Sequence, residues 1–385
     1  MFCCPKLMLV CTIAVVLSIT VGLHWQQTDN KQIIAFLLND MDKDADGCIS
    51  KDEANPLLKQ HFDRFDKDTD GKIDAKELPA LATVVARLQR GQNQNRNNRR
   101  RQRKLVVPDS VNRIVDIEYR KGTSKRWKLD LVHPKAKSES PRPAIVFIHG
   151  GGWRNGDKGW GAFGSMPIEY AEKGYVCISV NYRFIDEAPF PACIEDCKNA
   201  VRWLRANAET YNVDPDHIGA FGISAGAHLV SMLGLVKKER ELEGDGPHLE
   251  YSSAVTSVCC AAPPTNFLKW NGEEVDVSKM GWGLKQVFGA KTGNELKEMA
   301  EKSAPITYVQ SGAVPFLVIH GTADKTVPVF QGDCFAKALK DVGADVTYLR
   351  YDGAGHGVFH QKSDKTGPAL EKFFQRTLGQ QTTEP

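Results

Sequence analysis

The chain has 385 residues, more than one small core needs, so two modules or one large module with additions are expected. The net charge of +3 hides an uneven distribution, because carboxylates crowd residues 40–77 while Arg and Lys crowd residues 96–104. The ten cysteines are too few and too scattered for a disulfide scaffold, which excludes that class. Cys193 and Cys197, four residues apart on an expected helix, would form a strained bridge, and we interpret most cysteines as small buried side chains.

Residues 1–23 are mostly apolar. Lys6 precedes an uncharged run over residues 7–23, which is typical of an export signal. No small-x-small cleavage site follows, so the alternative is an uncleaved membrane anchor of about 17 residues. Either interpretation predicts an exported protein that is periplasmic, extracellular or attached to a membrane through residues 7–23.

Two twelve-residue stretches, 42–53 and 66–77, match the pattern of a calcium loop. Ca²⁺ takes six to eight oxygen ligands, and the pattern supplies oxygens at positions 1, 3, 5, 9 and 12, with Gly at position 6 for a sharp turn. A solvated acidic surface would need neither this glycine nor the isoleucine at position 8. The predicted Ca²⁺ ligands are Asp42, Asp44, Asp46, Cys48, Ser50 and Glu53 in the first loop and Asp66, Asp68, Asp70, Lys72, Asp74 and Glu77 in the second.

The tandem loops resemble the EF-hand family, which implies a small all-α module over residues 30–90 that binds calcium. Only twelve residues, 54–65, separate the loops, so the helix leaving the first is expected to double as the helix entering the second. One face of this helix is predicted to be core because its residues recur at helical spacing. These residues are Leu57, Leu58, His61, Phe62 and Phe65.

Residues 91–104 contain no apolar residue, so the stretch 91–107 is predicted to be a basic disordered linker. The alternative is a polybasic tether to anionic lipid headgroups or to an acidic polysaccharide. Nucleic acid is not expected as a partner of an exported protein.

Residues 108–380 alternate apolar strands with helices. This alternation predicts a mostly parallel sheet with helices on both faces and an active site at the carboxyl ends of the strands. A helix is expected over residues 190–208, and the stretch 218–229 predicts a strand, a tight turn and a helix. The other expected strands are 114–119, 128–132, 144–149, 175–181, 255–262, 316–320 and 346–351.

The turn in residues 218–229 carries Gly-Ile-Ser-Ala-Gly, with Ser224 at its tip. This is the nucleophile-elbow pattern, in which glycines let strand and helix approach while a strained backbone exposes the serine hydroxyl. The pentapeptide alone is a weak signal, because its residues are common. The rest of the chain therefore decides its interpretation.

Three further features support a catalytic serine. The strand before residue 149 ends in His-Gly-Gly-Gly-Trp, where the N–H groups of Gly151 and Gly152, with that of Ala225, would form an oxyanion hole. Asp324 and His356 each follow a strand, in the chain order Ser, Asp, His. Asp324 would orient His356, which would take the serine proton.

Other polar residues near these motifs receive different interpretations. Asp352, four residues before His356, is interpreted as a turn residue. His149, His228 and His320 are expected to be structural, with His149 bracing the oxyanion loop. Trp153 and Trp160 are candidates for stacking on an aromatic or sugar ring.

Together these motifs resemble the α/β-hydrolase fold, and within it the hormone-sensitive-lipase-like carboxylesterases with an HGGGW loop. The pattern at 149–158, the helix start at 190–196 and residues 324–328 resemble small exported feruloyl or acetyl-xylan esterases, and kynurenine-formamidase-like enzymes share the signature. The resemblance implies a triad of Ser224, Asp324 and His356. It also implies only a small cap, the segment 265–304 with Trp270, Trp282 and Phe288, which disfavours long-chain triglycerides.

The predicted function is that of an exported serine carboxylesterase acting on short acyl or aromatic esters, including esters linked to polysaccharide, through an acyl-enzyme. No cofactor is expected for catalysis. One alternative is an amidase, formamidase or peptidase with the same triad. A second is a non-catalytic calcium-dependent binding protein.

Overall fold

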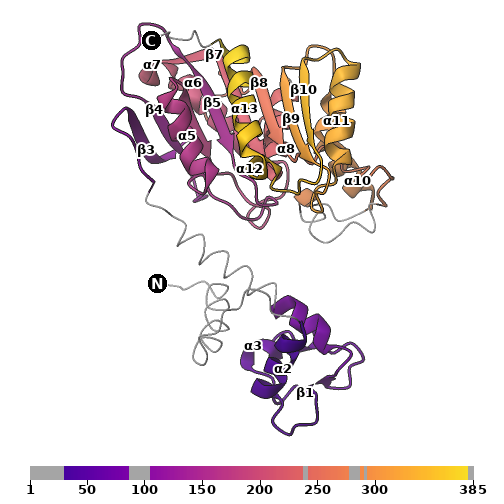
Figure 1. The fold of residues 1–385 in the computed structure, drawn as a ribbon. Helices are drawn as coiled ribbons and strands as arrows, with labels where there is room; N and C mark the ends of the chain where they lie inside the picture. Colours follow the sequence, from indigo (N-terminus) through magenta and orange to yellow (C-terminus); the bar gives the residue numbers. More distant parts are fainter. Residues whose placement is uncertain (1–29, 86–104, 237–241, 277–286, 290–292, 380–385) are drawn as a thin grey trace. The chain divides into compact units, whose positions relative to one another are not determined.

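The computed structural model describes residues 30–85, 105–236, 242–276, 287–289 and 293–379. The predicted export signal or anchor and residues 91–104 of the predicted linker 91–107 lie outside these residues. No helix in the described ranges is both long enough and apolar enough to cross a membrane. The chain divides into two compact units, one ending at Arg103 and one beginning at Lys104 (Figure 1).

The smaller unit is built from short elements around the two predicted calcium loops. In the strand pair, Ile49 faces Ile73, and these are the isoleucines at position 8 of each loop. Both side chains are fully buried, which explains why this position is apolar within an acidic stretch. The elements are α2 (Asn30–Met41), β1 (Ile49–Ser50), α3 (Pro56–Lys59), η1 (Phe62–Arg64) and β2 (Lys72–Ile73).

The prediction of a single helix between the two loops is wrong. The structure has the four-residue α3 followed by the 3-10 turn η1. In a 3-10 turn, residues three apart share a face, so Phe62 and Phe65 both enter the core while His61 is exposed. Leu58 is buried as predicted, and the side chain of Leu57 lies outside the described part of the structure.

The larger unit contains an eight-stranded sheet in the order β10-β9-β8-β7-β5-β6-β4-β3. All neighbours from β10 to β6 are parallel, and β4 and β3 join antiparallel at one edge, which confirms the predicted mostly parallel sheet. The strands are β3 (Val111–Glu118), β4 (Lys128–Pro134), β5 (Arg142–Ile148), β6 (Val176–Val180), β7 (Val213–Ile223), β8 (Ser257–Ala261), β9 (Phe316–Gly321) and β10 (Val346–Tyr351).

Helices cover both faces of this sheet (Figure 1). Alternate residues of each central strand enter different apolar clusters: Val146 of β5 belongs to the cluster that includes residues of α6, α8 and α11, whereas Phe147 belongs to the cluster that includes residues of α5, α12 and α13. The helical elements are α5 (Ala162–Glu172), α6 (Ala192–Ala206), α7 (Ala208–Tyr211), α8 (Ala225–Leu235), α10 (Gly293–Lys302), η4 (Pro305–Tyr308), α11 (Phe330–Asp341), α12 (Val358–Gln361) and α13 (Ser363–Leu378).

The parallel register aligns the carboxyl ends of the central strands. Ile148 of β5 pairs with Gly222 of β7, and Ile223 pairs with Ala261 of β8. Gly321 of β9 pairs with Tyr351 of β10. The loops that carry the sequence motifs therefore leave the sheet at the same edge.

The seven cysteines in the described ranges are all free. Cys193 and Cys197 are buried on α6 without a bridge, and burial raises the pKa of Cys193 to about 12. Within the described residues this confirms the interpretation of most cysteines as small buried side chains, with Cys48 and Cys334 only half-buried.

Candidate active site

Ser224 is the single residue between the end of β7 and the start of α8. Its φ of +58° is a conformation that costs a non-glycine residue about 1–3 kcal/mol. The flanking glycines make the turn sterically accessible: a Cβ on Gly222 would lie 2.3 Å from the carbonyl oxygen of Gly226, and a Cβ on Gly226 would lie 2.0 Å from that of Ile148. The strand and helix can therefore meet this closely only through glycine.

Ser224, His356 and Asp324 form a continuous chain of hydrogen bonds. His356 Nε2 lies 2.9 Å from Ser224 Oγ, and His356 Nδ1 lies 2.7 Å from Asp324 Oδ2. An ionised carboxylate only accepts, so Nδ1 carries the proton and Nε2 accepts the serine hydroxyl proton. Asp352 is instead exposed, with 92% of its side chain accessible, and lies 3.5 Å from Arg350.

Asp324 is held as a carboxylate by its surroundings. Burial acts to raise its pKa, but hydrogen bonds from His320, His356 and the Val327 N–H outweigh burial and hold the pKa well below its usual range. Its Oδ1 also accepts the N–H of Thr326 at 2.8 Å. His320, expected to be only structural, lies with Nε2 3.4 Å from Asp324 Oδ2 and 2.9 Å from the Val327 carbonyl oxygen.

The glycine loop after β5 lies against the elbow. A Cβ on Gly150 would be 2.7 Å from the carbonyl oxygen of Ile223, so the two turns are in direct contact. Gly151 and Gly152 have φ values of +121° and +61°. Neither N–H donates to a backbone carbonyl of the described residues, and Ala225 begins α8, where N–H groups have no partner within the helix. All three N–H groups are therefore without a backbone acceptor among the described residues.

His149 anchors the start of this loop. Its ring stacks on Tyr182 with centroids 4.6 Å apart, and the Tyr182 hydroxyl donates to the His149 carbonyl oxygen at 2.9 Å. Burial lowers the pKa of His149 to about 4, so the ring is neutral at neutral pH.

The two tryptophans near the loop differ in exposure. Trp153 is buried, and its ring packs on His228 and Phe267 with centroids 5.3 and 6.1 Å apart. Trp160 is 41% exposed. Of the two predicted stacking candidates, only Trp160 therefore has a ring surface open to solvent.

Gln331 was not predicted to matter, because no motif surrounds it, yet it anchors the segment that follows β8. Its fully buried amide oxygen accepts the N–H groups of Thr265 and Asn266, at 2.9 and 2.7 Å. Its amide nitrogen donates to the carbonyl oxygens of Lys269 and Trp270, both at 2.8 Å. These bonds shape the start of the predicted small cap, whose Trp282 lies outside the described ranges.

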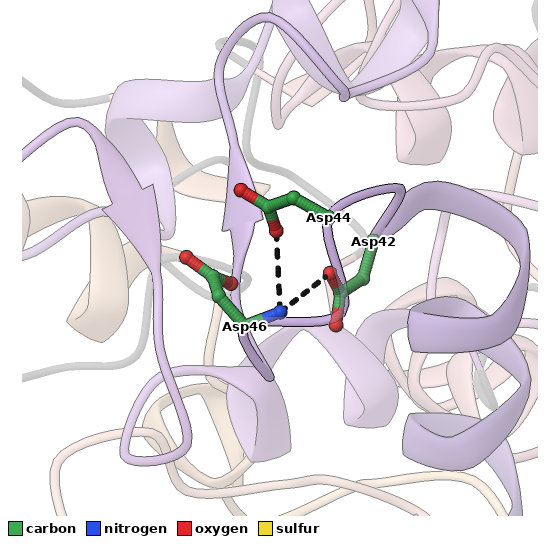
Figure 2. A group of neighbouring side chains, drawn as sticks. All are labelled: Asp42, Asp44 and Asp46. Atoms are coloured by element: carbon green, nitrogen blue, oxygen red, sulfur yellow. Dashed lines mark hydrogen bonds between the residues drawn. The ribbon is translucent and has the colours of Figure 1, made fainter.

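The calcium loops of the smaller unit bring carboxylates together. Oxygens of Asp42, Asp44 and Asp46 lie within 4.8 Å of one another, and the Asp46 N–H donates to both other carboxylates at 3.2 Å (Figure 2). The same holds for the oxygens of Asp66, Asp68 and Asp70.

A cation fits this donor set. Asp66 Oδ1 is buried and has no hydrogen-bond donor among the described residues, which suits a metal ligand. At position 12 of the first loop, hydrogen bonds from the Ser50 hydroxyl and from backbone N–H groups hold the pKa of Glu53 at about 2. The loop residues are therefore arranged as acceptors of a hard cation.

Lys72, at position 7 of the second loop, contacts the first loop. Its Nζ lies 2.5 Å from Asp46 Oδ2, so a lysine ammonium shares a carboxylate predicted to bind calcium. The antiparallel pairing of Ile49 with Ile73 brings the two loops side by side and makes this contact. Nothing in the spacing of either loop indicates it.

Two models of known protein families match the chain. The model of the BD-FAE family matches residues 129–339, which is more than half of the chain. The chain belongs to the BD-FAE family. This BD-FAE chain is thus a hormone-sensitive-lipase-like α/β hydrolase, as its motifs predicted. A second family model, described as EF hand, matches residues 58–81 around the second calcium loop.

Named relatives of the BD-FAE chain are esterases. Esterase LipC of Mycobacterium tuberculosis is 31% identical over 242 residues, which are 62% of this chain and 59% of LipC. Esterase LipQ of the same organism is 33% identical over 215 residues, 56% of this chain and 50% of LipQ. The chain therefore spans only half to three fifths of the length of these relatives.

Solved structures agree with this assignment. A truncated carbohydrate esterase from gut microbiota superposes with a TM-score of 0.63 at 27% identity, covering 70% of this chain and 97% of that one. Esterase 2 of Thermogutta terrifontis superposes with a TM-score of 0.57 at 25% identity, covering 72% and 95%. The BD-FAE chain therefore shares its fold with esterases along nearly their whole length.

Proposed function

We propose that the chain is a serine carboxylesterase that hydrolyses short acyl or aromatic esters through an acyl-enzyme. The observation that carries the proposal is the hydrogen-bonded chain from Ser224 through His356 to Asp324. The glycine loop supports it, because its first glycine, Gly150, lies against the serine turn and the N–H groups of Gly151 and Gly152 donate to no described backbone carbonyl.

In the first half of the reaction, Ser224 Oγ attacks the ester carbonyl carbon while its proton passes to His356 Nε2. The carbonyl oxygen becomes an oxyanion, which accepts hydrogen bonds from Gly151, Gly152 and Ala225. Asp324 stabilises the imidazolium that forms. His356 then returns the proton to the departing alcohol oxygen as the C–O bond breaks.

In the second half, water replaces the alcohol. His356 Nε2 takes a proton from water as the water oxygen attacks the acyl carbon. The same N–H groups hold the second oxyanion, and its collapse releases the acid and returns the proton to Ser224 Oγ.

The substrate class rests on similarity and on one surface residue. The relatives are named esterases, and one structural neighbour is named a carbohydrate esterase. The exposed Trp160 follows the glycine loop and offers a ring on which a sugar or aromatic group could stack. These features support esters attached to aromatic acids or to polysaccharide.

We propose that the smaller unit binds Ca²⁺ and that the apolar N-terminal stretch directs export. Asp66, Asp68, Asp70 and Glu77 would hold Ca²⁺ in the second loop, and the matching residues of 42–53 would hold it in the first. Bound Ca²⁺ supplies positive charge that offsets carboxylate repulsion, which is a structural role. Residues 1–23 support export, to a periplasmic, extracellular or membrane-attached location.

Substitution of the nucleophile tests the proposal. Ser224→Ala should abolish hydrolysis of a chromogenic acetate ester and covalent labelling by a serine phosphonate. Its free energy of unfolding should stay within about 0.5–1 kcal/mol of wild type, since a half-buried hydroxyl contributes little to packing. Ser165→Ala, at an exposed serine on α5, is the matched control and should keep both activities. Labelling of Ser224→Ala at another serine would refute the assignment.

A substrate panel separates the alternatives. Acetyl, butyryl and feruloyl esters and the corresponding amides should be compared by kcat/KM on one enzyme preparation. Ester rates well above amide rates are expected. Faster amide cleavage would favour the amidase or formamidase alternative.

A further inference from the structure

His228 lies on α8, one turn after Ser224, and its side chain is fully buried. The indole N–H of Trp153 donates to His228 Nδ1 at 3.3 Å, and His228 Nε2 lies 2.7 Å from the carbonyl oxygen of Ser303. An indole N–H only donates and a carbonyl oxygen only accepts. The imidazole is therefore neutral, with its proton on Nε2, and both ring nitrogens are satisfied.

This imidazole joins three parts of the site. Trp153 directly follows the oxyanion-loop glycines, His228 belongs to the nucleophile helix, and Ser303 directly follows α10 in the segment between β8 and β9. The Trp153 and His228 rings meet edge to face, with centroids 5.3 Å apart. The Phe267 ring also meets the His228 ring edge to face, with centroids 5.5 Å apart.

The oxyanion loop needs such support. Gly151, Gly152 and Trp153 all have positive φ, which is unfavourable for Trp153 because it has a Cβ. A residue remains in that conformation only where surrounding contacts hold it. The hydrogen bond to His228 is the polar contact that holds its indole.

We propose that His228 is a positioning residue that holds the Gly151 and Gly152 N–H groups at the correct distance from Ser224. The proposal rests on the proposed esterase function. His228 touches no reacting atom: it acts through Trp153 on one side and Ser303 on the other. Oxyanion-hole donors act mainly in the transition state, so loss of this support should lower kcat and leave KM nearly unchanged.

Three variants isolate the hydrogen bond. His228→Phe keeps a ring but has neither acceptor nor donor, and Trp153→Phe keeps a smaller aromatic ring but has no N–H. Each should lower kcat about 10- to 100-fold with KM within about threefold, because a displacement of about 1 Å costs up to 10²-fold. The double variant should be no worse than the poorer single variant, as expected for two ends of one interaction.

Conservative rescue and a matched control exclude general loss of packing. His228→Gln offers both an amide oxygen and an amide N–H, and should recover most of kcat. Trp203→Phe, a buried tryptophan on α6, should leave kcat unchanged. Thermal unfolding of every variant shows whether it is folded. If His228→Phe does not fold, the kinetics of Trp153→Phe and His228→Gln still test the positioning role of His228.

Two readouts keep this proposal separable from the esterase proposal. The rate of Ser224 phosphonylation also depends on the oxyanion donors but needs no ester turnover, so it measures positioning even if no ester in the panel is cleaved. The indole N–H resonance of Trp153 should shift in His228→Phe whatever the activity. Each of four results would overturn the assignment. They are an unshifted indole resonance, values of kcat and labelling rate within about twofold of wild type, an increase in KM alone, and additive effects of the two single variants.

Discussion

Ser224 and Asp324 show how single side chains acquire their roles from neighbouring backbone. The positive φ of Ser224 results from two glycines that no other residue can replace without a clash. Asp324 accepts the N–H groups of Thr326 and Val327, which orients its other oxygen toward His356. The reactivity of both residues is therefore a property of their turns as much as of their side chains.

Asp324→Asn should retain the fold and lose activity. The amide keeps the carboxylate shape but favours the wrong His356 tautomer, which in serine proteases lowers kcat by about 10⁴. Asp352→Asn is the matched control and should change kcat less than about twofold, because Asp352 is exposed. Steady-state kinetics on both variants shows which aspartate is the acid of the triad. An inactive Asp352→Asn together with an active Asp324→Asn would reverse the assignment.

At the scale of elements, α8 and β5 set the geometry of the site by direct backbone contact. Gly226 on α8 faces the carbonyl oxygens of Ile148 and His149 at the end of β5. Because the oxyanion loop begins at that end, a change in helix–strand distance moves the loop relative to Ser224.

Gly226→Ala should therefore damage stability and catalysis together. Its Cβ would lie 2.0 Å from the Ile148 carbonyl oxygen, and backbone cannot yield as a flexible side chain can. We expect the free energy of unfolding to fall by about 1–3 kcal/mol, the range for overpacking, and kcat to fall strongly.

Gly234→Ala on the same helix is the comparison. Its Cβ would meet side-chain carbons of Val258 and Val314, away from the site, so stability should fall while kcat is retained in the folded protein. Urea unfolding and kinetics measure both, and equal kcat losses in the two variants would contradict this account of the contact.

At the scale of the whole molecule, the larger unit contains two histidines that are buried in the neutral form. Burial lowers the pKa of His149 and of His228 to about 4. In an unfolded chain both would titrate near the ordinary value of about 6.5. Between these two pKa values, both histidines are protonated in the unfolded chain but remain neutral in the folded chain.

Stability should therefore decrease as the pH falls from about 6.5 to about 4. Each histidine contributes a slope of up to about 1.4 kcal/mol per pH unit across this window, and its full contribution is present above 6.5. Urea unfolding followed by tryptophan fluorescence measures the slope. His228→Gln should make the slope shallower, and an unchanged slope would show that His228 is not buried as a neutral base.

Calcium removal should affect the two units differently. Residues 91–104 between them carry no apolar anchor, and coupling between sites requires a shared element that both ligands bias. Chelation should lower the melting temperature of the smaller unit alone, giving two separable calorimetric transitions. Hydrolysis of a small ester should change less than about twofold, which is about 0.4 kcal/mol.

The contrary outcome is equally measurable. A tenfold loss of activity on chelation, reversed by calcium and absent from a chain that begins at Val107, would show that the calcium loops and the active site are coupled.

The sequence by itself determined the features that depend on local chemistry. The alternation of apolar strand runs with helices predicted a mostly parallel sheet with helices on both faces, because a strand covered on both faces is apolar along its length. The placement of glycines and the loop spacing indicated the elbow, the oxyanion loop and the calcium loops, since these turns need either a positive φ or a close backbone approach that a Cβ would block. Ser224, Asp324 and His356 were predictable because each follows a strand whose carboxyl end reaches one edge of the sheet.

Only the tertiary structure decided which distant side chains meet. Trp153 and His228 are 75 residues apart, as are His228 and Ser303, and Gln331 reaches Thr265 across 66 residues. Lys72 reaches Asp46 only because two short strands pair. Between the calcium loops, the short helix α3 and the 3-10 turn η1 stand in place of the single expected helix, and His61 is exposed. Such contacts depend on packing geometry and leave no periodic or local pattern, so the sequence carries no signal of them before the chain has folded.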